Sequence, residues 1–143
     1  AYRRTDELDG KTAFGSIEAT GLRTNVLHLP EMGSGDGGIF STVEDIHRLW
    51  QAFWGGALVS AEAVASMTTP HDGGNDPDQA YGLGFWLRPS SRAVRSEGYD
   101  AGVSFRSISH PDGRVTRTVI SNWSDGAWPM SRRVEEIVGR EAI

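Results

Sequence analysis

Side chains with oxygen ligands crowd into one short stretch of the sequence and raise the question of a metal site. Asp72, Asn75, Asp76 and Asp78 supply carboxylate and amide oxygens, which are the ligands that Ca²⁺ prefers. Their spacing does not fit the EF-hand pattern, so we interpret residues 71–79 as a solvated loop. The histidines are far apart, and no two have the i, i+4 spacing of a helical metal site; they are His28, His47, His71 and His110. The sequence therefore predicts no metal and no cofactor.

Two other kinds of chemistry are also disfavoured by the residue types present. The sequence contains no cysteine, which excludes disulfides, thiolate metal sites and a cysteine nucleophile, and leaves the cellular compartment undetermined. Residues Gly33 to Gly38 form a glycine-rich stretch that could cradle a phosphate. That stretch lacks the Gly-Lys-Ser/Thr ending of a phosphate loop, so we interpret it as an ordinary loop.

Length and charge limit the class of protein further. A chain of 143 residues is long enough to bury a core, and we expect residues 1–143 to form a single domain. The formal net charge of −5 argues against a nucleic-acid partner, because phosphate binding requires clustered positive charge. No apolar run approaches the ~20 residues that a membrane-spanning helix needs, so no membrane segment is expected.

Two helices are predicted in the middle of the chain. Ser41 can cap the first, with Glu44 at the capping-box spacing, and Gly55-Gly56 ends it. Its apolar residues fall on one face, which we interpret mainly as core, with a substrate-cleft lining as the alternative; they are Val43, Ile46, Leu49, Trp50, Phe53 and Trp54. The second helix is expected to begin at Ser60 and to end before Pro70.

The C-terminal half is typical of strands followed by one helix. Strands are predicted at Tyr81–Leu87, Val103–Ser109 and Val115–Asn122, and a further short one at Leu22–Leu29. The last two of the C-terminal strands flank His110-Pro111-Asp112-Gly113, a strong hairpin signal. A final helix is expected to begin near Pro129 and to bury its apolar residues, which are Met130, Val134, Ile137 and Val138. This order predicts an α+β fold, an antiparallel sheet of about three or four strands flanked by helices.

Several segments occur in an order that is familiar from one protein family. Residues 37–46 read GGIFSTVEDI, residues 67–70 read MTTP, residues 81–86 read YGLGFW, residues 97–105 read EGYDAGVSF and residues 119–122 read VISN. In this order and spacing they resemble class C-type β-lactamases and their relatives among penicillin-binding proteins and esterases. The resemblance runs from about Gly37 to the end. It implies that the chain is the C-terminal part of the β-lactamase/transpeptidase-like fold.

The family resemblance implies nucleophilic catalysis by a part of the protein that this chain does not contain. Family members attack a β-lactam or ester carbonyl with the Ser of Ser-x-x-Lys, helped by that Lys and by the Tyr of Tyr-x-Asn. Here Lys11 is the only lysine and Leu8 stands three residues before it, so no Ser-x-x-Lys exists. We therefore predict no catalytic residue in this chain and expect the chain alone to be inactive.

A third family motif, Lys-Thr-Gly or His-x-Gly, lies on a strand edge that binds the substrate carboxylate and helps to form the oxyanion hole. By position it falls at about Gly98-Tyr99-Asp100, where there is neither Lys nor His, although backbone N–H groups could still polarise a carbonyl. Tyr99 is open to two interpretations, a packing aromatic or a substrate contact. The resemblance thus implies a set of substrate-binding residues, Gly98, Tyr99, Asp100, Ala101, Gly102, Val103 and Ser104.

These observations lead to one hypothesis and one alternative. The chain is expected to be the C-terminal fragment of a serine hydrolase that forms an acyl-enzyme with a small-molecule substrate, namely a β-lactam, a D-amino-acid peptide or an ester. The alternative is a non-catalytic domain that keeps the fold and binds a ligand or partner. An incomplete sheet leaves an unpaired edge and an exposed core face, so we expect this chain to pair with an N-terminal chain of the same protein or to self-associate.

Overall fold

The computed structural model describes residues 2–4, 16–17, 22–25, 31–35, 37–73, 76 and 78–138 of the chain. Three helices are described, α1 (Val43–Trp54), α2 (Ala61–Met67) and α3 (Ala127–Val138). Nine strands are described, β1 (Tyr2–Arg4), β2 (Ser16–Ile17), β3 (Leu22–Thr24), β4 (Asp72–Gly73), β5 (Ala80–Tyr81), β6 (Trp86–Arg88), β7 (Ala93–Asp100), β8 (Val103–Ser109) and β9 (Thr116–Ser121). No helix among these residues is both long enough and apolar enough to cross a lipid bilayer.

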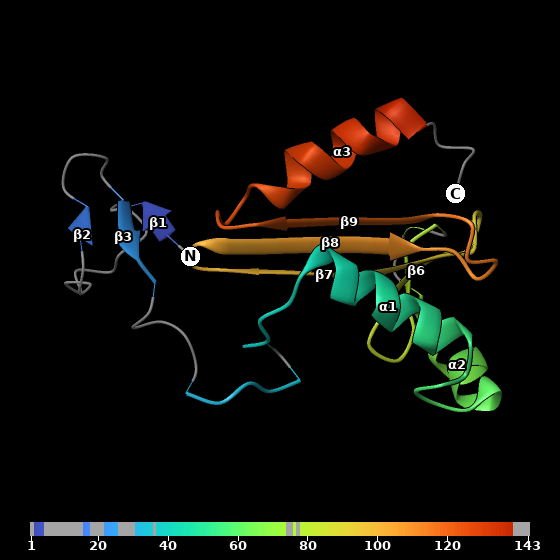
Figure 1. The fold of residues 1–143 in the computed structure, drawn as a ribbon. Helices are drawn as coiled ribbons and strands as arrows, with labels where there is room; N and C mark the ends of the chain where they lie inside the picture. The colour runs from blue at the N-terminus through green and yellow to red at the C-terminus, as the bar shows by residue number, and fades with distance from the viewer. Residues whose placement is uncertain are drawn as a thin grey trace.

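The main sheet is antiparallel, with six strands in the order β4-β5-β6-β7-β8-β9. Helices α1 and α2 lie on one face and α3 lies on the other (Figure 1). The predicted α+β class, an antiparallel sheet flanked by helices, is confirmed. The predicted strand number of three or four was too low. Strand β4 is only two residues long, the predicted strand Tyr81–Leu87 is divided between β5 and β6, and β7 was not predicted from the residue pattern.

The centre of this sheet is a pair of long hairpins that share β8. The predicted strand Val103–Ser109 is confirmed, and the predicted strand Val115–Asn122 is shorter, at Thr116–Ser121. Between β8 and β9, the Gly113 N–H donates to the His110 carbonyl over 2.9 Å, and Gly113 has a φ of +67°. Glycine adopts this left-handed conformation without strain, which is why the turn signal in the sequence was correct.

The two helices on the first face begin at capping residues. Helix α1 is capped by Thr42 rather than by Ser41 as predicted, because the Thr42 side chain accepts the Asp45 N–H. The Thr42 hydroxyl also donates to the Asp45 carboxylate over 2.9 Å. The capping pair is therefore Thr42 with Asp45, one residue later than the predicted pair of Ser41 with Glu44. Helix α2 is capped by Ser60, as predicted.

The predicted single strand Tyr81–Leu87 is wrong, since the chain turns back in its middle. The stretch forms the end of β5, a turn and the start of β6, and the Gly82 N–H donates to the Phe85 carbonyl over 2.8 Å. Gly84 has a φ of +84°, which ends the extended conformation. Gly82 lies so close to α2 that an added Cβ would stand 2.1 Å from the Met67 carbonyl oxygen. Its small size is therefore needed for packing.

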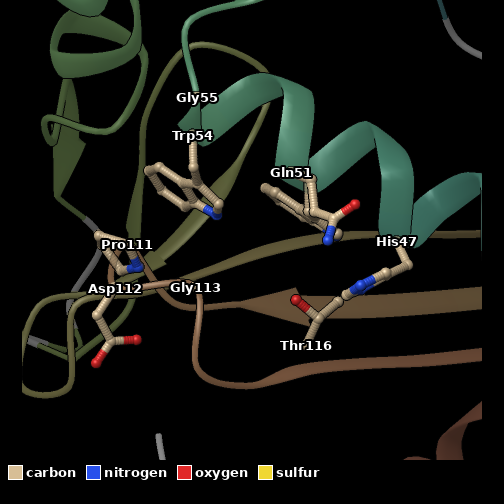
Figure 2. A pocket seen from close by; sticks show the side chains of 9 residues that line it. His47, Gln51, Trp54, Gly55, Pro111, Asp112, Gly113 and Thr116 are labelled. Atoms are coloured by element: carbon tan, nitrogen blue, oxygen red, sulfur yellow. The ribbon is translucent and has the colours of Figure 1, made fainter.

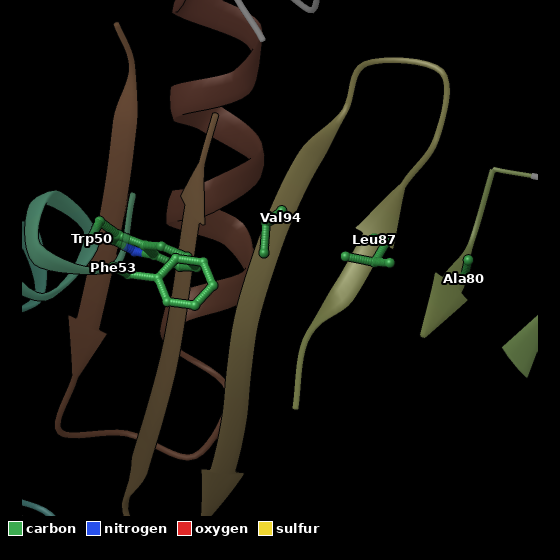
Figure 3. Close-up of a cluster of buried hydrophobic side chains, with 5 residues drawn as sticks. All are labelled: Trp50, Phe53, Ala80, Leu87 and Val94. Carbon is green, nitrogen blue, oxygen red and sulfur yellow. The ribbon is translucent and has the colours of Figure 1, made fainter. Parts of the chain in front are cut away.

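The core lies between α1 and the sheet, and it consists of Trp50, Phe53, Ala80, Leu87 and Val94 (Figure 3). The prediction that the aromatic face of the first helix is core is confirmed for Trp50 and Phe53, which are 2% and 4% exposed. The Trp50 indole N–H donates to the Ser107 hydroxyl over 2.8 Å, and that hydroxyl also bonds Thr118 of β9. The buried polar groups beneath α1 are thereby satisfied.

Helix α3 places small residues against the sheet, which contradicts the prediction that its long apolar residues are buried. Ala127 and Ser131 are the buried residues, and the helix begins at Ala127, ahead of the expected Pro129. Of the four residues predicted to be buried, Val134 is half-buried, and three are exposed; they are Met130 (57%), Ile137 (70%) and Val138 (41%). Small residues allow the helix to approach the sheet closely, and the long side chains then point away from it.

The N-terminal strands form a separate three-stranded antiparallel sheet in the order β1-β3-β2. Strand β3 covers the first part of the predicted strand Leu22–Leu29, and residues 26–30 lie outside the described residues. Asn25, which follows β3, is 2% exposed, and its side-chain amide donates to the Ala101 carbonyl over 2.7 Å. The residue that follows β3 is therefore bonded to the turn between β7 and β8.

Candidate functional site

Strand β7 lies in the middle of the sheet, but the second half of the strand has a described strand on one side only. Strand β6 pairs only with Ala93 to Arg95, so Ser96 to Asp100 have β8 as their sole strand neighbour among the described residues. Alternate N–H and C=O groups of a strand point to each side, and this stretch therefore presents free backbone donors and acceptors. The first three of the residues predicted to bind substrate, Gly98 to Asp100, lie on this open edge.

The next two predicted residues, Ala101 and Gly102, form the two-residue turn that closes the β7–β8 hairpin. Gly102 has a φ of +75°, and its N–H donates to the Ser124 hydroxyl over 2.9 Å. The Ala101 N–H donates to the Asp100 carboxylate over 2.6 Å, and the Ala101 carbonyl accepts from Asn25. Because these turn groups already have partners, the backbone donors open to a ligand are those of the β7 edge.

The strand register separates the predicted residues onto two faces. Gly98 pairs with Phe105 and Tyr99 pairs with Ser104, so neighbours along β7 point to opposite sides of the sheet. Tyr99 points to the α3 side, where its ring makes an edge-to-face contact with Trp128 at 6.4 Å between centroids. Gly98 points to the α1 side, where an added Cβ would meet nothing within 4 Å. Tyr99 is 76% exposed, so its ring contacts Trp128 at one edge and is otherwise open to solvent.

Val103 and Ser104 begin β8, and Ser104 has a structural task. Its side chain is fully buried and its hydroxyl donates to the Trp123 carbonyl over 2.6 Å and accepts the Ala127 N–H over 2.9 Å. Both bonds hold the start of α3 against the sheet. The Ser104 side chain thus joins the hairpin to the start of α3, while the open edge of β7 remains on the surface.

Charged side chains beside the edge were missed by the sequence reasoning. Glu97 on β7 forms ion pairs with Arg106 of β8 over 2.6 Å and with Arg95 over 3.3 Å. The Arg106 guanidinium lies 4.7 Å from the centre of the Trp128 ring. Burial lowers the pKa of Arg95, which the Glu97 carboxylate opposes. The only sequence signal for this cluster was that Arg95 and Glu97 are two residues apart and so lie on one face of a strand. That signal indicates an ion-pair cluster only when the pairing of Glu97 with Arg106 is known.

The other residues considered from the sequence do not converge on a site. Among the residues that the structure describes, no group of three or more His, Asp or Glu side chains could hold a metal ion. Asp78 instead pairs with Arg88 over 3.7 Å, and Asn75 lies outside the described residues. The Ser34 N–H donates to the Gly37 carbonyl, a turn within the glycine-rich loop. His71 and His110 contact backbone carbonyls, and His28 lies outside the described residues.

A shallow cavity of about 330 Å³ lies at the opposite end of the β7–β8 hairpin (Figure 2). It opens between α1 and the turn joining β8 to β9, and its lining residues are His47, Trp50, Gln51, Trp54, Gly55, Pro111, Asp112, Gly113 and Thr116. The two Trp side chains in its wall already donate their indole N–H groups to Ser107 and Ser109. The cavity lies at the other end of the hairpin from the open edge of β7.

Comparisons with known proteins agree on the fold. The chain is similar to a penicillin-binding protein from Bacillus halodurans, with 32% sequence identity and a TM-score of 0.76 over 96% of this chain and 44% of that one. It is also similar to a D-stereospecific amidohydrolase from Streptomyces sp., with 23% identity and a TM-score of 0.58 over 69% of this chain and 30% of that one. No family model matches the chain, and no curated protein does.

These structures identify the class of fold, which is that of penicillin-binding proteins and β-lactamases. The fold inferred from the motif order is confirmed in this respect. The chain spans less than half of the length of either protein, so the activity of a whole protein is a matter for proposal.

Proposed function

We propose that this chain is the substrate-edge part of a serine hydrolase of the β-lactamase and penicillin-binding type. It would bind an acylated D-amino-acid peptide, a β-lactam or a small ester along Ser96 to Asp100. The observation that carries the proposal is the open edge of β7 within a sheet that superposes on a penicillin-binding protein. The second similar structure is a D-stereospecific amidohydrolase, which supports a substrate with a carbonyl to be attacked.

The role of the chain in this proposal is to bind and orient the substrate. A substrate amide can pair with the free N–H and C=O groups of β7 as an added strand would, which fixes its register. An N–H of the edge that points at the scissile carbonyl stabilises the negative charge that develops on its oxygen. Gly98 permits close approach of the substrate, because no side chain shields the backbone there. The guanidinium groups of Arg95 and Arg106 lie beside the edge, and both form ion pairs with Glu97.

The nucleophile belongs to a part of the protein outside this sequence. With Lys11 as its only lysine, the chain has no Ser-x-x-Lys, and we propose that it is the C-terminal part of a longer fold that contains this motif. The serine oxygen would attack the substrate carbonyl and form an acyl ester as the C–N or C–O bond breaks and the amine or alcohol takes up the serine proton; in a β-lactam the ring opens and the amine stays attached. Water would then hydrolyse the ester and regenerate the serine.

The second candidate function is a non-catalytic domain that binds a ligand or partner on the same edge. It is favoured by one observation, which is that Gly98-Tyr99-Asp100 contains neither the Lys nor the His expected there from the family. The Tyr99 ring lies on the α3 side against Trp128, whereas Gly98 is open on the α1 side.

Labelling with a fluorescent penicillin, followed by intact-mass measurement, tests the proposal. The penicillin should add covalently to the polypeptide with Ser-x-x-Lys when that polypeptide is present with this chain, and the chain alone should keep its mass. Gly98→Val should slow acylation at least tenfold by covering the edge. Gly37→Val, at another position where a Cβ meets nothing within 4 Å, is the matched control. Saturable penicillin binding without a covalent adduct would favour the non-catalytic candidate, and acylation of this chain alone would overturn the proposal.

A further inference from the structure

The open edge of β7 presents a defined set of side chains to the α1 side of the sheet. Ser96 pairs with Ser107, whose hydroxyl accepts the indole N–H of Trp50 in α1, so Ser96 points to the α1 side. Because side chains alternate along a strand, Gly98 and Asp100 point to the same side. A ligand that lies along the edge on this side therefore meets a hydroxyl, a bare stretch of backbone and a carboxylate.

The positive charges near the edge lie on the other face and already have partners. Arg95 and Glu97 point to the α3 side, where the Glu97 carboxylate forms ion pairs with Arg95 over 3.3 Å and with Arg106 over 2.6 Å. The Arg95 guanidinium also lies 5.7 Å from the centre of the Trp86 ring, and the Arg106 guanidinium lies 4.7 Å from that of Trp128. The two arginine side chains are only 22% and 20% exposed. Both guanidinium groups are therefore held away from a ligand on the α1 side.

The charge of Asp100 is not compensated in the described part of the chain. Glu97, the other carboxylate of β7, has two arginines, whereas Asp100 forms no ion pair with a described residue. The Asp100 side chain is exposed, and its carboxylate accepts only the Ala101 N–H, over 2.6 Å. The residues of β8 opposite Asp100 and Gly98 are Val103 and Phe105, which are neutral. The α1 side of the edge is therefore negative.

From this distribution of charge we propose that the edge selects acyl donors without a carboxylate near the scissile bond, namely neutral esters and peptide amides. The inference rests on the proposed function for the position of the substrate along Ser96 to Asp100. A substrate carboxylate on the α1 side would meet the like charge of Asp100 and no described cation, and such juxtaposition weakens binding. A neutral ester or amide can still pair with the backbone of the edge and bond the Ser96 hydroxyl.

Benzylpenicillin and its methyl ester are a matched pair of acyl donors that differ in this carboxylate. Each is mixed with protein that contains this chain together with Ser-x-x-Lys, and acylation is followed by intact mass. Each rate is divided by the rate at which hydroxide opens the same compound, which corrects for intrinsic reactivity. We expect the methyl ester to acylate at least tenfold faster. Equal rates, or a faster reaction of the free acid, would overturn the inference and leave the proposed hydrolase intact.

Substitutions on the edge test whether its charge causes the preference. Asp100→Asn keeps an acceptor for the Ala101 N–H but removes the charge, and it should reduce the preference to less than about threefold. Ser96→Lys places a cation on the α1 side and should reverse the preference. Asp72→Asn is the control, because it removes an exposed carboxylate from β4, outside the edge. Circular dichroism shows whether each variant is folded. An identical preference in Asp100→Asn and Asp72→Asn would contradict the inference.

Binding of a second pair of ligands separates this inference from the proposed function. Acetyl-D-alanyl-D-alanine and its C-terminal amide are titrated into the same protein, and the amide chemical shifts of Ser96 to Asp100 report binding at the edge. Tighter binding of the amide, without acylation by either penicillin compound, would reject the hydrolase and retain the selectivity. Acylation together with equal or tighter binding of the free acid would reject the selectivity and retain the hydrolase.

Discussion

The two ends of the β7–β8 hairpin are held by different kinds of contact. At the end near Ser109, aromatic side chains of α1 cover the sheet, and Trp50 and Phe53 are almost fully buried. At the other end, around Ala101, the contacts are single hydrogen bonds from small polar groups, such as Asn25 and Ser104. Tyr99 at this second end is 76% exposed. We call the first the core end and the second the site end.

This difference shows how the fold divides stability and function. Apolar burial is insensitive to direction and supplies most of the free energy of folding, whereas hydrogen bonds fix geometry at a smaller net gain. The site end therefore has defined positions for the turn but keeps its backbone edge open. Regions that bind ligands are commonly drawn from the less stable parts of a structure.

Removal of the main aromatic at the core end should have the largest effect. Trp50→Ala deletes a buried ring in contact with Phe53 and Phe85 and should lower the free energy of unfolding by about 3–5 kcal/mol. Urea denaturation followed by circular dichroism measures this loss. Trp86→Ala is the control, because Trp86 is 41% exposed and its loss should cost less than half as much. Equal losses would show that the core is not centred on α1.

Substitution of one glycine at each end compares how tightly the backbone is packed at the two ends. Gly82→Ala, at the core end, places a methyl group 2.1 Å from the Met67 carbonyl oxygen and should lower the free energy of unfolding by about 2 kcal/mol. Gly98→Ala, at the site end, meets nothing within 4 Å and should change it by less than about 0.5 kcal/mol. Thermal unfolding of the two variants provides the measurement. A large loss in Gly98→Ala would mean that the edge is closed by a neighbour.

The hydrogen bonds at the site end should have a smaller and more local effect. Ser104→Ala leaves the buried Ala127 N–H without its acceptor and should lower the free energy of unfolding by about 1–2 kcal/mol. Because the bond holds the start of α3, the amides of α3 should exchange faster in this variant than those of α1. Equal acceleration in both helices would indicate that the site end and the core end unfold as one unit.

The sequence was a better guide to the core end than to the site end. The turn sequence at His110 between two strand-like segments and the apolar face of α1 were strong local signals, and the predicted hairpin and core were found there. The burial of α3 was predicted wrongly, because which helix face meets the sheet depends on the close approach that Ser131 and Ala127 permit. The ion pair of Glu97 with Arg106 depends on strand register, which local sequence does not specify.

The smallest expected effect is a loss of folding stability at acidic pH, and it arises from the β8–β9 turn at the core end. The Asp112 carboxylate accepts the Arg114 N–H, which lowers the pKa of Asp112 below its usual value of 3.8, and the nearby His110 and Arg114 side chains act in the same direction. A carboxyl with a lowered pKa in the folded state stabilises the fold above its unfolded pKa, and that contribution disappears as the pH falls through the folded pKa.

The free energy of unfolding should therefore decrease slightly below about pH 4 in the natural sequence. Asp112→Asn should remove this part of the pH dependence, because the amide oxygen can still accept the Arg114 N–H but carries no charge. Since the Asp112 side chain is exposed to solvent, the difference should be small and should shrink further with added salt. Urea titrations between about pH 5 and 2.5 measure it. An identical pH profile in the variant would mean that the turn owes its stability to the conformation of Gly113 rather than to the carboxylate.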